Sequence, residues 1–106
     1  PEQGGPNAAF FGAFHGLELP FLFGVTEFAV GLARYRPGPA DLAVTAAMQG
    51  YWARFAATGD PNGGGAAPWS AYDRAAEAYQ RLASPVSSGT AVRGAQCDFW
   101  DGLARR

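Results

Sequence analysis

The 106-residue chain contains no lysine and no isoleucine, and it has one cysteine, one histidine and one methionine. All eight of its cationic residues are therefore arginine, and against nine acidic residues they leave a net charge of −1. This balance provides no basic stripe for nucleic acid and no polybasic patch for a membrane surface. With Cys97 alone, a disulfide framework within the chain is excluded, which leaves a buried thiol or a bridge to another chain.

Several classes of site are excluded by missing patterns. No G-x-S-x-G, Walker or H-E-x-x-H signature occurs, and the three glycines at 63–65 lack the lysine and the preceding strand of a phosphate-binding loop. A single histidine cannot supply the several ligands that a metal site needs, so we expect no metal. We expect no organic cofactor either. No apolar run is long enough to span a bilayer, and residues 1–10 lack the basic and apolar segments of a signal peptide.

Residues 41–58 show the clearest hydrophobic periodicity in the chain. Asp41 is a plausible N-cap, and Gly59 fits the left-handed position that follows a last helical turn. The sequence therefore predicts a helix from about 41 to 58. Its apolar face is formed by Val44, Met48, Tyr51, Trp52 and Phe55.

The other segments carry weaker signals. Leu17 to Phe23 can form one or two helical turns, with Pro20 in the first turn and Gly24 as the stop. Cys97, Trp100 and Ala104 would share one side of a C-terminal helix. Residues 1–14 are expected to form a loop, and residues 25–40 form an ambiguous segment that could contain a short helical turn. A surface loop over 61–68 and an extended or turn segment at 69–73 should follow. The last expected elements are a short strand within 77–83 and the C-terminal helix over 94–106.

The chain is rich in aromatic residues but poor in elements that could bury them. Fifteen Phe, Trp and Tyr residues make up 14% of the sequence. Each removes a large area from water when it is buried, yet only one long periodic segment is present. We therefore expect the aromatic side chains to be buried against polypeptide outside these 106 residues.

His15, the only imidazole of the chain, lies between Gly12 and Gly16. These glycines allow a sharp turn that presents a side chain at a loop tip, although a lone histidine is more often a structural or surface residue. Glu18 follows at the start of an apolar segment, where burial without a partner would be costly. It could lie behind a catalytic centre, or it could be an ordinary acidic residue favoured by the helix dipole.

Four segments together resemble the C-terminal part of the type-B carboxylesterase family, which includes the cholinesterases. They are GAFHGLELPFLFG (12–24), YWARFAATGDPNG (51–63), PWSAYD (68–73) and CDFWDGL (97–103). Their order and spacing are those of the family over about residues 11–103. The resemblance implies an α/β fold, the α/β-hydrolase, with a central and mostly parallel sheet between helices. Residues 1–106 would be the C-terminal part of one such domain and consist mainly of helix and loop.

The resemblance also implies a function. His15 matches the triad histidine of the family's H-G-x-E block, and Glu18 matches its buried acidic residue near the triad. A serine hydrolase that cleaves small-molecule carboxylic esters by two-step acyl transfer is therefore expected. None of the serines at 70, 84, 87 and 88 lies in a nucleophile elbow. The serine, the acid and the oxyanion loop would come from the upstream portion of the same enzyme, as a larger companion chain.

Some alternatives stay open. The fold also occurs in non-catalytic adhesion or binding modules, which need not keep the triad, and the chain could be an autonomous helical interaction domain. The resemblance places the start of the chain in a surface loop and Cys97 where many relatives have a bridged cysteine. A bridged Cys97 would favour a secreted or periplasmic protein over a cytoplasmic one. The lack of Lys and Ile, with abundant Ala, Arg and Gly, suggests a GC-rich bacterial genome.

Overall fold

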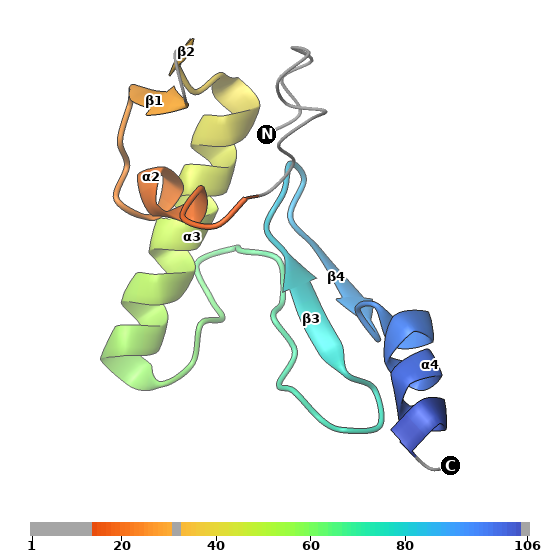
Figure 1. Cartoon of the computed structure of the whole chain (residues 1–106). Coiled ribbons are helices and arrows are strands. Elements are labelled where there is room, and N and C mark those ends of the chain that lie inside the picture. The colour runs from red at the N-terminus through yellow and green to blue at the C-terminus, as the bar shows by residue number, and fades with distance from the viewer. Residues whose placement is uncertain (1–13, 31–32, 105–106) are drawn as a thin grey trace.

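The computed structural model describes residues 14–30 and 33–104, so the loop expected over 1–14 lies almost entirely outside the described residues. Helices alternate with two short β-hairpins along the chain (Figure 1). The elements are α2 (Glu18–Leu22), β1 (Phe28–Val30), β2 (Ala33–Tyr35), α3 (Pro39–Thr58), β3 (Ala78–Arg81), β4 (Ser87–Thr90) and α4 (Gly94–Ala104).

The long helix α3 confirms the helix predicted over 41–58, but it begins earlier. Its N-cap is Gly38, so the prediction that Asp41 is the N-cap is wrong. Asp41 instead lies in the first turn, where its Oδ2 accepts a hydrogen bond of 3.0 Å from the Gly38 N–H. Pro39 occupies the first turn, where its missing N–H costs nothing. The helix ends as predicted at Gly59, whose φ of 77° is left-handed.

The short helix α2 packs across α3 and forms the core of the described structure. Phe21 of α2 is 7% exposed and packs with Val44 and Met48 of α3. The Gln49 side chain adds a hydrogen bond, since its Nε2 donates to the Leu22 carbonyl at 3.2 Å. The helical turns predicted for residues 17–23 are thus confirmed.

The region 25–40 holds a β-hairpin, so the helical turn expected there is wrong. β1 and β2 pair antiparallel, with Phe28 opposite Tyr35. The Glu27 carboxylate contacts Arg34 Nη1 at 2.6 Å and Arg36 Nη2 at 3.3 Å. Arg34 and Arg36 are two residues apart, and such side chains share one face in a strand but not in a helix. The contact of both arginines with Glu27 therefore suits an extended backbone at residues 34–36.

The second hairpin contains β3, which confirms the strand predicted within 77–83. It also contains β4, the partner strand that the sequence did not indicate. β3 and β4 pair antiparallel, with Tyr79 opposite Gly89. A Cβ on Gly89 would lie 2.6 Å from the Tyr79 ring, so glycine is needed for the ring to cover this position. Within the described residues both sheets are antiparallel pairs, and the central parallel sheet of an α/β-hydrolase is not formed by these residues.

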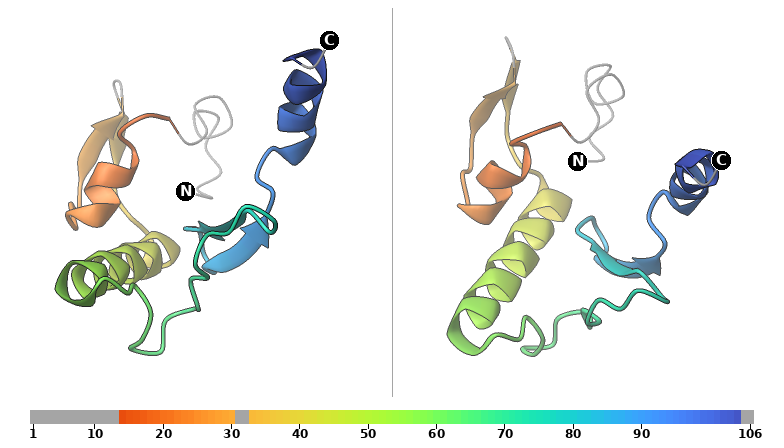
Figure 2. Two further views of the ribbon diagram at one scale, coloured as in Figure 1. Left: turned by 90° about the horizontal axis from the view of Figure 1, so that it is seen from below. Right: turned by 60° about the horizontal axis from the view of Figure 1, so that its bottom comes forward.

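The predicted C-terminal helix is confirmed as α4, but it contributes nothing to the core. Its residues from 95 to 104 are all exposed, Cys97 among them, so the structure of this chain does not show the buried thiol that was one of the two alternatives for Cys97. The views agree that α4 lies at the far end of the molecule from α3 (Figures 1 and 2). None of the described helices is both long and apolar enough to cross a membrane.

The molecule is extended for its length. The radius of gyration is 16.5 Å, whereas about 13 Å is expected for a compact chain of this length. The accessible surface is 7981 Å², against about 5,700 Å² for a folded monomer of this mass. Among the described residues only Phe21, Val44, Met48 and Tyr51 form the buried apolar core. The structure therefore agrees with the expectation that most aromatic side chains are not buried within the chain.

Candidate active site

His15 lies on a tight turn that leads into α2. The Leu17 N–H donates to the Phe14 carbonyl at 3.2 Å, which makes His15 and Gly16 the two central residues of a β-turn. Gly16 has a φ of 84°, which is the value a type II turn requires at its third residue. The glycine that follows the histidine is thus used to turn the backbone.

The imidazole of His15 is exposed. No hydrogen bond or ion pair to the rest of residues 14–30 and 33–104 fixes the ring. The turn itself is anchored, because Leu17 packs against the cluster of Phe21, Val44 and Met48. A histidine displayed in this way can accept a proton from a group presented by another surface, but its own neighbours do not orient it.

Glu18 is the first residue of α2, and its side chain is exposed. In this structure it therefore has the place of an acidic first-turn residue, and it does not bear the cost of burial. It contributes to the wall of a small pocket of about 180 Å³, which Asp41 and Ser84 also line. His15 is not part of that wall, so the pocket lies beside the turn and not beneath the imidazole.

Asp41 is the one buried acidic residue among those described, with 4% of its surface exposed. It interacts with Tyr35, and the pKa of the Tyr35 hydroxyl is raised by burial first and then by its bond to Asp41 and the charge there. The sequence indicated only a capping role for Asp41. Tyr35 is the last residue of β2, so this interaction of Asp41 involves the β1–β2 hairpin, which the sequence did not predict.

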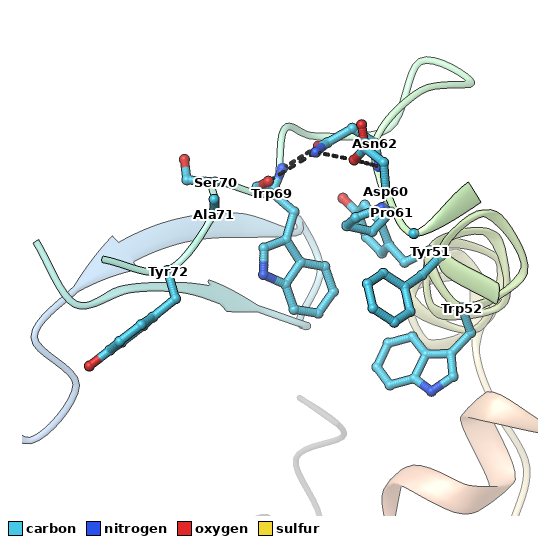
Figure 3. Close-up of a pocket in the computed structure, with 11 residues that line it drawn as sticks. Tyr51, Trp52, Asp60, Pro61, Asn62, Trp69, Ser70, Ala71 and Tyr72 are labelled. Carbon is cyan, nitrogen blue, oxygen red and sulfur yellow. Dashed lines mark hydrogen bonds between the residues drawn. The ribbon is translucent and has the colours of Figure 1, made fainter. Parts of the chain in front are cut away.

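A larger pocket of about 780 Å³ lies between the C-terminal half of α3 and residues 69–72 (Figure 3). Its aromatic wall includes Trp52 and Trp69, whose ring centroids are 6.1 Å apart. Asp60 is the only charged residue among those that line it. Neither His15 nor Glu18 lines this pocket.

A family model described as the carboxylesterase family matches residues 1–100 of the chain. The chain belongs to the carboxylesterase family. The resemblance to the type-B carboxylesterase family is thereby confirmed. This family implies an α/β-hydrolase fold, of which the described residues form helices and two small antiparallel sheets.

Curated relatives agree with this assignment. The chain is 34% identical over 93 residues to carboxylesterase 5A of Felis catus, a match that covers 87% of this chain and 17% of the relative. It is 36% identical over 92 residues to carboxylesterase 4A of Bos taurus, with 87% of this chain and 16% of the relative covered. Acetylcholinesterase of Gallus gallus is 34% identical over 94 residues, which are 87% of this chain and 12% of that protein.

The chain spans less than a fifth of the length of these curated relatives. The relatives named above are animal proteins, and the bacterial origin suggested by composition stays a prediction. The catalytic role of His15 and the supporting role of Glu18 also stay predictions.

Proposed function

We propose that this chain supplies the triad histidine, His15, of a serine hydrolase that cleaves carboxylic esters. The serine and the acidic triad member come from the upstream portion of the same enzyme. That portion completes the α/β-hydrolase domain, either in one polypeptide with residues 1–106 or as a larger companion chain. The substrate is a small-molecule ester.

The chemistry is acyl transfer in two steps. The His15 imidazole takes the proton of the serine hydroxyl as the serine oxygen attacks the ester carbonyl, and the imidazolium then gives that proton to the departing alcohol. In the second step the same imidazole takes a proton from water, which attacks the acyl-enzyme and releases the carboxylic acid. The acidic triad member holds the imidazole in the correct tautomer and stabilises the imidazolium.

The position of His15 on the type II turn carries this proposal. The ring is exposed and has no partner in the described residues, while its backbone is anchored through Leu17 to the core. Such a side chain is free to accept partners from a neighbouring surface. Membership of the carboxylesterase family makes an ester hydrolase the activity that fits best.

Glu18 is proposed as a positioning residue and not as a group that touches the substrate. It begins α2 three residues after His15, and its carboxylate is exposed toward whatever covers this face. A hydrogen bond from the completed domain to this carboxylate would fix the end of the turn. Glu18→Gln keeps one acceptor oxygen and should therefore lower kcat by less than Glu18→Ala does.

The test is the hydrolysis of short p-nitrophenyl esters by the complete protein. His15→Ala should lower kcat/KM by more than about 10⁴-fold, because the members of a triad act as a unit. Arg74→Ala, at an exposed turn away from His15, is the control and should leave kcat/KM unchanged. Equal turnover by wild type and His15→Ala would overturn the proposal and would favour the non-catalytic binding module.

A further inference from the structure

Asn62 is followed directly by Gly63, and two more glycines come after it. An asparagine side chain can react with the backbone nitrogen of the next residue, and a glycine there lets the nitrogen approach because it carries no side chain. The glycines at 63–65 have φ values of 111°, 62° and 76°, which glycine adopts without the strain that other residues meet. The sequence after Asn62 is therefore suited to this reaction.

We propose that the Asn62–Gly63 bond is a deamidation site that the folded loop holds back. The Gly63 nitrogen bonds to Cγ of Asn62 as the Cγ–Nδ2 bond breaks, and Nδ2 leaves as ammonia with the proton of the Gly63 N–H. Water then adds to one carbonyl of the resulting cyclic imide and breaks its bond to the Gly63 nitrogen, which regains a proton. Opening at Cγ leaves an aspartate, and opening at the main-chain carbonyl leaves an isoaspartate.

Three hydrogen bonds hold the amide that would react. Nδ2 of Asn62 donates to Oδ1 of Asp60 at 2.8 Å and to the Trp69 carbonyl at 3.0 Å. Oδ1 of Asn62 accepts from the Trp69 N–H at 2.7 Å (Figure 3). Both amide hydrogens and the amide oxygen thus have partners, and the bond to the carboxylate is of the stronger, charge-assisted kind.

The backbone before Asn62 is also fixed. The Asn62 N–H donates to Oδ1 of Asp60 at 2.9 Å, and Nε of Arg54 donates to the Pro61 carbonyl at 2.7 Å. Closing the imide ring requires the Asn62 side chain to rotate toward the Gly63 nitrogen, which breaks the bonds of the amide. The reaction therefore proceeds through a local opening of the loop and is slow while the loop is closed.

The product cannot restore these contacts. An aspartate in place of Asn62 would set an oxygen where Nδ2 now lies, against the Asp60 carboxylate and the Trp69 carbonyl. Like charges repel and two acceptors cannot pair, so the loop loses the bonds that close it. Trp69 then loses the support that holds its ring edge-on to Tyr51. Opening allows the reaction and the reaction keeps the loop open, so the site acts as a one-way switch.

Peptide mass spectrometry of the complete protein tests the site. Cleavage at Arg54 and Arg74 releases residues 55–74, in which Asn62 carries the single side-chain amide, and deamidation adds about 1 Da. In urea, Asn62 should react at least several-fold faster than Asn7, which alanine follows. In the folded protein, Asn62 should react at least about tenfold more slowly than in urea. Equal rates in either comparison would overturn the proposal.

Two matched substitutions test what holds the reaction back. Asp60→Ala removes the two hydrogen bonds that Asn62 donates to Asp60, and it should speed deamidation in the folded protein at least about threefold. Asp73→Ala also removes two hydrogen bonds, those from the N–H groups of Ala75 and Ala76, and it should leave the rate unchanged. Equal rates in the two variants would show that the Asn62 contacts do not control the reaction and would overturn the proposal.

The effect of the product on the loop has its own measurement. The deamidated protein carries one more negative charge and can be separated by anion exchange. It should unfold at a lower urea midpoint than the unreacted protein, as should Asn62→Asp, and an unchanged midpoint would overturn the one-way switch. His15→Ala should deamidate at the wild-type rate, so a failure here is separate from a failure of the proposed activity.

Discussion

The side chain of Asn62 pairs with the backbone of Trp69 through both of its polar atoms. Its Oδ1 accepts a hydrogen bond of 2.7 Å from the Trp69 N–H, and its Nδ2 donates to the Trp69 carbonyl at 3.0 Å (Figure 3). The amide closes the glycine-rich loop between the two residues in the way that a strand partner would. This closure places the Trp69 ring against Tyr51.

Asn62→Ala should destabilise the complete protein by about 1–3 kcal/mol, because two backbone groups of Trp69 lose their partners. Asn62→Asp keeps the acceptor but places an oxygen against both the Asp60 carboxylate and the Trp69 carbonyl, so it should cost at least as much as Asn62→Ala. The free energy of unfolding, measured with urea, checks this order. A neutral Asn62→Ala would mean that the loop is held in some other way.

Gly16→Ala should reduce both stability and turnover. A Cβ at this position meets nothing within 4 Å, so the cost arises from the positive φ alone and is about 1–2 kcal/mol. Any relaxation of the turn also moves His15. Gly102→Ala in α4 is the control, since there too a Cβ meets nothing and the φ is not left-handed. The control should be neutral or slightly stabilising, and equal losses in both variants would contradict a special role for the turn.

Tyr51→Phe should cost about 0.5–1.5 kcal/mol of unfolding free energy, because the hydrogen bond from the buried hydroxyl to the Ala67 carbonyl is lost. Tyr72→Phe makes the same chemical change at a ring that is 67% exposed, and it should cost almost nothing. Thermal or urea unfolding of the two variants gives the comparison. The account fails here if the two substitutions are equivalent.

Asp60 should contribute an acid-sensitive part of the stability. Hydrogen bonds from the Asn62 backbone and side chain hold the pKa of the Asp60 carboxyl below its ordinary 3.8. Because the folded state favours the ionised form, the contribution is complete above the ordinary pKa and is lost as pH falls through the lower, folded value. Asp60→Asn should therefore flatten the fall in unfolding free energy below about pH 4. An unchanged pH profile would contradict this.

The sequence was informative where local signals and packing agree. The 3.6-residue pattern around Met48 and the left-handed Gly59 predicted α3, and Gly24 marked the end of α2. It was misleading at the β1–β2 hairpin. Nothing local reveals that Glu27 will bind Arg34 and Arg36 at once, and this depends on the register of two strands. The prediction that Asp41 is the N-cap was wrong because Pro39 is compatible with the first helical turn, so α3 begins before Asp41.

The candidate site was less accessible to sequence reasoning than the fold. Residues 12–24 supplied His15 and Glu18 through a family resemblance, and the family itself is confirmed. Periodicity and composition alone left the histidine as an ordinary surface residue. The structure shows the turn that carries His15, and the partners of its imidazole stay part of the proposal.

The rate at which a fluorophosphonate labels the complete protein tests the role of His15 most directly. This reagent forms a covalent bond to a serine that has an activated hydroxyl, so it reports the first step of acyl transfer without product release. Wild type should take up one equivalent, and His15→Ala should be labelled at least about 100-fold more slowly. Equal labelling rates for the two proteins would contradict the account.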